Sequence, residues 1–185
     1  MTLTLLHILE AGLVISLVLG RFMVYDSAAA QRALAAFPRS RPAAWILTAI
    51  DLAWVVLIMR GASLGPFDIL KPYLPLIGLA AYAAILWGIG ELLAVRALGG
   101  LLLLLGDPIL DAVRWTGGYW PIAVAILAYI LVIIGAIWVL WPWTFRKTHE
   151  RLTKTPLRWR LWSALWLTLG LVFLVGVIVR WQPHA

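Results

Sequence analysis

Six long apolar stretches, separated by short segments that hold most of the charge, make up nearly all of this 185-residue chain. A helix needs about twenty mainly apolar residues to cross the roughly 30 Å hydrocarbon core of a bilayer. Lipid cannot satisfy backbone N–H and C=O groups, so apolar stretches of this length are expected to be helical. The pattern predicts an all-α polytopic membrane protein with six transmembrane helices arranged as three hairpins. The predicted spans, within one transmembrane domain of residues 1–185, are 3–25, 43–59, 73–95, 97–115, 119–141 and 161–179.

The fourth stretch has the shortest apolar run, from Ala97 to Leu110, and a re-entrant helix is the alternative there. The basic residues decide between the two. With six spans, eleven of the fifteen Lys and Arg residues fall on one side of the membrane. A re-entrant segment would move the richest basic segment to the other side. Because Lys and Arg concentrate in cytoplasmic segments, the sequence favours six spans with both termini on the outer side.

Composition narrows the class of protein further. Hydrophobic residues make up 64% of the chain and charged residues 12%, about half the charged fraction of a soluble domain. The absence of cysteine excludes disulfides, thiolate metal sites and thiol nucleophiles. The formal charge of +7 lies beside apolar spans, which favours lipid headgroups as partners rather than nucleic acid. Abundant Arg, Ala and Leu are typical of a bacterial protein, so the expected location is the bacterial inner (plasma) membrane.

Two spans carry small residues at helical spacing. Gly12, Ser16 and Gly20 recur every fourth residue in the first span, and the third span repeats the pattern (Ala80, Ala84 and Gly88). Small residues let the backbones of membrane helices approach closely. The favoured interpretation is helix packing within the chain, and the alternative is docking to a partner subunit.

Asp51 lies about eight residues from either end of the second span and therefore near the middle of the membrane. An ionisable side chain at that depth is costly unless it is paired or wet, which makes it a functional candidate. Tyr82 and Tyr129 come out at similar depth, at a rise of about 1.5 Å per residue. We expect the three side chains to form a polar network. Its role is either a hydrogen-bond clamp between helices or a relay for protons or cations.

His7 and Glu10 are three residues apart in the first span, where they predict a proton-accepting pair or a ligand of haem or chlorophyll. Glu91 near the end of the third span is a further candidate proton group. A lone histidine near a helix end is, however, more often simply hydrogen-bonded.

Twelve tryptophans are many for 185 residues, and most lie where interfacial belts are expected. Near the start of the last span, Trp159 and Trp162 share a helix face and are flanked by Arg158 and Arg160. This group predicts contact with lipid headgroups at the interface. Stacking on a quinone ring is the alternative.

The chain has no nucleophile elbow, HExxH motif, haem-attachment motif or phosphate-binding glycine loop. We therefore expect a non-enzymatic membrane protein without cofactor or metal, acting as an accessory or structural subunit of a membrane complex or homo-oligomer. Its partners would be the lipid bilayer and other membrane subunits or itself. One alternative is a small proton- or cation-coupled transporter or channel using Asp51. The other is a membrane anchor that binds quinone, haem or chlorophyll.

Overall fold

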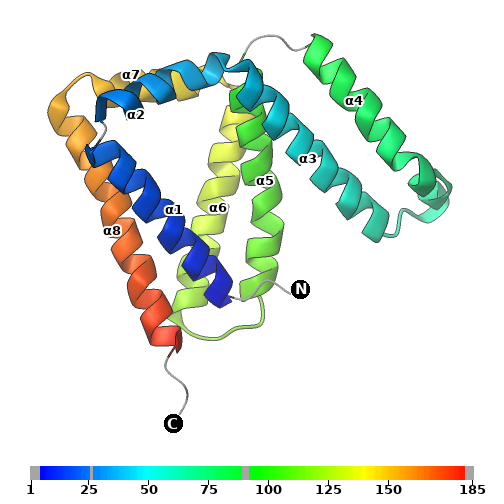
Figure 1. Ribbon diagram of the computed structural model, residues 1–185. Helices are drawn as coiled ribbons and strands as arrows, with labels where there is room; N and C mark the ends of the chain where they lie inside the picture. Colours follow the sequence, from blue (N-terminus) through cyan, green and yellow to red (C-terminus); the bar gives the residue numbers. More distant parts are fainter. Residues whose placement is uncertain (1–4, 26, 89–91, 182–185) are drawn as a thin grey trace. The chain divides into compact units, whose positions relative to one another are not determined.

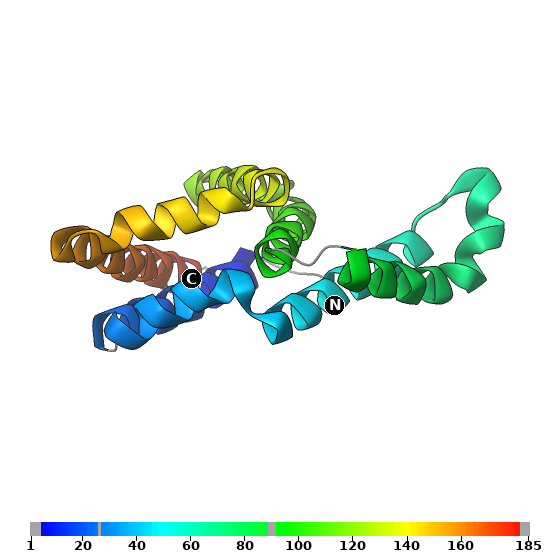
Figure 2. The same ribbon diagram turned by 90° about the horizontal axis from the view of Figure 1, so that it is seen from above.

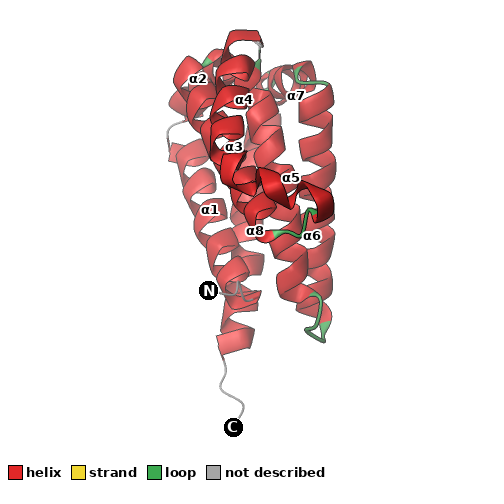
Figure 3. Ribbon diagram, turned by 90° about the vertical axis from the view of Figure 1, so that its right-hand side faces the viewer, coloured by secondary structure: helices red, strands yellow, loops and turns green. Residues whose placement is uncertain are grey.

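The computed structural model describes residues 5–25, 27–88 and 92–181. Within these ranges every regular element is a helix and no strand occurs (Figure 3). Six helical segments of the described chain are long and apolar enough to cross a membrane. The predictions of an all-helical fold and of six spans are therefore confirmed. The spanning segments are Leu5–Tyr25, Arg41–Gly61, Gly65–Gly88, Leu93–Val113, Tyr119–Leu140 and Pro156–Val179.

The elements follow one another with short connections. In chain order they are α1 (Leu5–Tyr25), α2 (Ser27–Ala36), η1 (Phe37–Arg39), α3 (Arg41–Gly61), η2 (Gly65–Tyr73), α4 (Leu74–Gly88), α5 (Leu93–Val113), α6 (Tyr119–Leu140), α7 (Trp143–Thr153) and α8 (Pro156–Trp181). The two η elements are 3₁₀-helices.

Contacts divide the chain into two compact units. Unit 1 comprises residues 1–35, 105–131 and 146–185, and unit 2 comprises 36–104 and 132–145. Each unit holds one half of α5 and one half of α6. The prediction of one transmembrane domain over residues 1–185 stays a prediction.

Unit 1 is organised around the pairing of α1 with α8, which lie side by side (Figure 1). Toward the start of α1, Leu9 and Phe173 belong to a core that also includes Val113 of α5 and Val124 of α6. Toward its end, the indole Nε1–H of Trp159 donates to the carbonyl of Met23 at 3.2 Å. Apolar contacts and this hydrogen bond therefore tie the first spanning helix to the last.

In unit 2, α3 and α4 lie side by side and η2 joins them at one end (Figure 2). A Cβ added at Gly78 of α4 would lie 2.8 Å from Val56, so a glycine is needed for this approach. The halves of α5 and α6 in this unit are closer still. A Cβ at Gly99 would lie 2.7 Å from the carbonyl oxygen of Gly135, and one at Gly135 would lie 2.6 Å from that of Gly99.

The boundary between the third and fourth spans differs from the prediction. Helix α4 ends at Gly88 rather than at residue 95, and α5 begins at Leu93 rather than 97. Leu92 has a φ of 58°, in the left-handed region, and its carbonyl accepts the N–H groups of Val95 and Arg96. With this conformation at Leu92, α5 begins four residues before its predicted start. Helix α5 then continues through Pro108 to Val113, as one spanning helix.

The segments expected to be loops are also more ordered than predicted. The polar stretches after the first and fifth spans form α2 and α7, and α8 begins at Pro156 instead of 161. Polar residues at helical spacing with a few apolar ones are compatible with short helices at a membrane surface. The arrangement as three successive hairpins is not confirmed. Helix α1 pairs extensively with α8, which is not its neighbour in the sequence, and α3 pairs with α4.

Candidate functional site

Asp51 lies on the side of α3 that contacts α5. A Cβ added at Gly100 would lie 2.9 Å from the carboxylate Oδ2 of Asp51, so the missing side chain at Gly100 makes room for this group. Thr48, one turn earlier on α3, is 4% exposed. Neither the Thr48 hydroxyl nor the Asp51 Oδ1 has a hydrogen-bond partner among the described residues, although both atoms are buried.

The predicted network of Asp51 with two tyrosines is not formed as a set of hydrogen bonds between described residues. The Tyr82 hydroxyl donates instead to the backbone carbonyl of Trp45, at 3.3 Å. Tyr129 is 58% exposed and belongs to unit 1, whereas Asp51 and Tyr82 belong to unit 2. The polar neighbour that sequence reasoning missed is Thr48. Its position three residues before Asp51, on the same helix face, is the signal that would have found it.

Two buried oxygens without partners, carried three residues apart on α3, are chemically significant in a membrane-spanning helix. A buried polar group left unsatisfied costs about 1–3 kcal/mol, and a buried charge costs more. Such a pair can be satisfied by a proton on the carboxylate, by a water or by a small cation. Among the described residues, no three His, Cys, Asp or Glu side chains gather as they would to hold a metal ion.

The small residues of α1 face α8. A Cβ added at Gly12 would lie 2.7 Å from the ring of Phe173, and one at Gly20 would lie 2.6 Å from the side chain of Leu167. Ser16 is 1% exposed, and its hydroxyl donates to the carbonyl of Gly12 within α1 at 2.6 Å. This ridge is therefore occupied by a helix of the same unit.

The corresponding residues of α4 have no such neighbour. Ala80, Ala84 and Gly88 are all exposed, and a Cβ at Gly88 would meet nothing within 4 Å. Helix α4 packs on α3 through another face, which includes Gly78 and the buried Leu74. Nearby on α4, Trp87 is 94% exposed. Within unit 2, the small-residue ridge of α4 is uncovered.

The tryptophans at the start of α8 have two different environments. Trp159 is 5% exposed and packs with Met23 and Ala30, so its ring joins helices of unit 1, and its place in an interfacial belt stays a prediction. Trp162 is partly buried against the same cluster, with its ring edge-to-face to Trp166 at 6.1 Å between centroids.

Arg158 and Arg160, the two arginines predicted to contact lipid headgroups, also have different surroundings. One guanidinium nitrogen of Arg158 donates to the carbonyl of Arg151 at 3.4 Å. Arg160 instead lines a cavity of about 640 Å³ in unit 1, together with Trp159, Gln31 and Thr155. The cavity also has an apolar side that includes Leu167, so it has the mixed character of a site for an amphiphile.

The remaining candidate proton groups lie in different places. His7 and Glu10 are in the first two turns of α1, where His7 is exposed and Glu10 half-buried. Glu91 lies outside the described residues.

Comparison with known proteins adds no relative. No protein-family model matches the chain, and no significant similarity links it to a curated protein or to a solved structure.

Proposed function

We propose that this protein is a non-enzymatic structural subunit of a bacterial inner membrane, and that it assembles with a second copy of itself through α4. The observation that carries the proposal is the uncovered ridge of Ala80, Ala84 and Gly88. The small residues at the same spacing on α1 are covered by α8. Exposing small side chains to lipid gains little, whereas close backbone contact with another helix gains dispersion energy and weak hydrogen bonds.

A second copy is the occupant that fits this ridge best. Two copies inserted with the same topology are related by a two-fold axis along the membrane normal, which makes their α4 helices parallel. Parallel helices with small residues four apart form right-handed dimers in membranes. Such a contact is self-complementary, so one ridge serves both copies. Both termini are proposed to lie on the outer side of the membrane.

Cysteine cross-linking tests the assembly, because the natural chain contains no cysteine. A cysteine at Ala84 should form a disulfide-linked dimer when membranes are treated with a mild oxidant, since a disulfide needs Cα atoms about 4.4–6.8 Å apart. Ala83 provides the matched control, because it is an exposed alanine displaced by about 100° around the same helix. Ala83→Cys should give little dimer on a non-reducing gel.

A second measurement does not depend on disulfide chemistry. Ala84→Leu should lower the dimer fraction in mild detergent, measured by light scattering, whereas Ala83→Leu should leave it unchanged. A larger side chain at the ridge holds the backbones apart. Equal cross-linking at the two positions, or monomers throughout, would contradict assembly through α4.

A second candidate function has support of its own in the Thr48–Asp51 pair. Buried oxygens without partners near the middle of a span are typical of proton and ion pathways in membranes. On this proposal, Asp51 takes up and releases a proton or binds a small cation, with Thr48 as its neighbour. Replacing Asp51 with asparagine separates this function from a structural one, because asparagine cannot take up or release a proton at neutral pH.

A further inference from the structure

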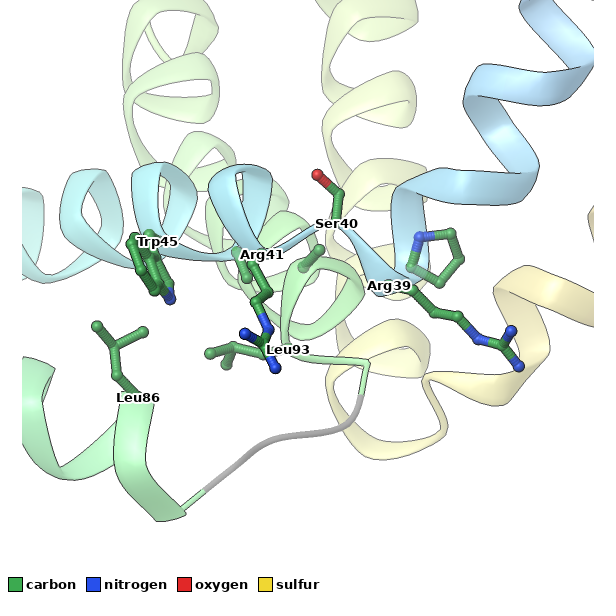
Figure 4. A pocket seen from close by; sticks show the side chains of 9 residues that line it. Arg39, Ser40, Arg41, Trp45, Leu86 and Leu93 are labelled. Atoms are coloured by element: carbon green, nitrogen blue, oxygen red, sulfur yellow. The ribbon is translucent and has the colours of Figure 1, made fainter.

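A second cavity lies in unit 2, where α3 begins. It has a volume of about 250 Å³ and is lined by residues of η1, α3, the end of α4 and the start of α5. Trp45 and Leu86 face each other across it, and the side chain of Arg41 extends toward Leu93 (Figure 4). The Arg39 side chain points away from this group (Figure 4). The cavity therefore combines apolar walls with the exposed cationic side chain of Arg41.

The charge of Arg41 is available for a ligand. Its side chain has no salt bridge with any described residue. Arg41 is also the first residue of α3, where the positive end of the helix dipole makes a cation unfavourable. Arg41 therefore does not serve to stabilise α3. Together with the dipole it makes this end of the cavity attractive to an anion.

The walls and the size of the cavity indicate which anion fits. A guanidinium binds phosphate through two parallel hydrogen bonds, and an indole is suited to the boundary between lipid and water. Drug-sized ligands occupy about 300–1,000 Å³, so a volume of about 250 Å³ suits a compact head rather than a whole lipid.

Apolar side chains of α3 beside the cavity are exposed. Trp45 is 53% exposed and Ile46 is 60% exposed, on a helix long and apolar enough to lie in the membrane. Acyl chains can therefore run along α3 while the head stays next to Arg41.

We propose that this cavity binds the phosphate-bearing head of an anionic phospholipid, with Arg41 as its main ligand and Trp45 and Leu86 as its apolar walls. Basic pockets between membrane helices are known to take such heads. The inference is independent of assembly through α4, because all the described residues that line the cavity belong to one copy of unit 2.

Lipid retention tests the proposal. The protein is reconstituted in nanodiscs with equal amounts of phosphatidylglycerol and phosphatidylcholine, then released into mild detergent. Native mass spectrometry counts the phosphatidylglycerol that stays bound. Arg41→Gln should lower this retention at least about tenfold, because the loss of even one of the two charge-assisted hydrogen bonds has that effect.

Arg32→Gln is the matched control. It removes the same charge from an exposed arginine of α2 that does not line the cavity, and it should retain phosphatidylglycerol like the natural protein. Trp45→Ala, at a half-exposed wall of the cavity, should lower retention in the same direction as Arg41→Gln. Unchanged elution of each variant in gel filtration shows that it is folded.

Three results would overturn the proposal. One is equal loss of lipid in Arg41→Gln and Arg32→Gln, which would mean that only overall charge matters. Another is equal retention of phosphatidylcholine and phosphatidylglycerol. The third separates a lipid head from free phosphate: if millimolar inorganic phosphate displaces the bound lipid, the site is a phosphate site and not a phospholipid site.

Discussion

Among individual residues, Thr48 and Asp51 carry polar atoms that packing alone does not explain. The Thr48 hydroxyl and the Asp51 Oδ1 are buried, and neither has a hydrogen-bond partner among the described residues. The glycine at position 100 leaves space for the Asp51 carboxylate instead of filling it. A chain under pressure only to pack would have an apolar residue at position 48, because an unpaired buried hydroxyl is destabilising.

Thr48→Val tests whether the hydroxyl is unpaired in the folded protein. Valine has nearly the same shape and removes only the polar atom. If the hydroxyl has no partner, the free energy of unfolding should stay the same or rise by up to about 1 kcal/mol. Thermal unfolding in detergent measures this. A loss of 1 kcal/mol or more would mean that the hydroxyl has a strong partner, contrary to the geometry.

Asp51→Asn separates the structural from the transporting function. Asparagine keeps the size and hydrogen-bonding capacity of the side chain but cannot hold or release a proton at neutral pH. If Asp51 moves protons or cations, the variant should lose flux in proteoliposomes carrying a pH-sensitive dye while its melting temperature stays close to that of the natural protein. Undiminished flux in Asp51→Asn, or no flux in the natural protein, would exclude this second function.

Sequence reasoning predicted that Asp51 lies halfway along its helix, as it does in α3, but it did not predict the neighbours of this residue. Depth follows from counting residues along a helix of known rise. Neighbours depend on how each helix is rotated about its own axis, which an apolar sequence surrounded by lipid specifies weakly. For that reason the Tyr82 hydroxyl, expected near Asp51, donates instead to the carbonyl of Trp45.

Among the helices, glycines mark the closest approaches. At Gly99 and Gly135 the nearest atoms of the opposing helix belong to its backbone, whereas at Gly12 and Gly20 they belong to side chains. A flexible side chain can move aside, but a helix backbone moves only if the whole helix shifts. The contact between α5 and α6 is therefore the less tolerant of the two.

Substitution of these glycines should show the difference. Gly99→Ala and Gly135→Ala should each destabilise the protein by about 1–3 kcal/mol, the usual cost of overpacking. Gly61→Ala is the control, because nothing lies within 4 Å of an added Cβ there, and it should be neutral or slightly stabilising. Thermal unfolding in detergent distinguishes these outcomes. Equal melting temperatures for all three variants would contradict the close contact of α5 and α6.

The sequence predicts which stretches form spanning helices, but it does not predict the residues at which these helices begin and end. Six apolar stretches of about twenty residues give six helices because a helix satisfies every backbone hydrogen bond within one such stretch. The ends depend on local chemistry that hydropathy does not register. Leu92 adopts a left-handed conformation that favours glycine, and the resulting start of α5 lies four residues before the predicted one. Helices α2 and α7 were missed because they are too polar to register as spans.

For the whole molecule, the distribution of basic residues predicts the orientation in the membrane. The chain has no cysteine, so single cysteines can be introduced without interference. In intact cells, cysteines at the exposed positions Ala33 and Thr148 should resist a membrane-impermeant thiol reagent, and one at the exposed Ser63 should react. All three should react once the membrane is permeabilised. Reaction at Thr148 but not at Ser63 would invert the topology.

The hydrogen bond from Trp159 to Met23 has a consequence for the order of events during biosynthesis. The two residues are separated by 136 positions, so at about 5–20 residues per second the ribosome adds Trp159 roughly 7–27 s after Met23. Until then the glycines of α1 lack the helix that covers them. A nascent chain interrupted before α8 would leave α1 exposed in the membrane, where chaperones or proteases that recognise orphan helices could detect it.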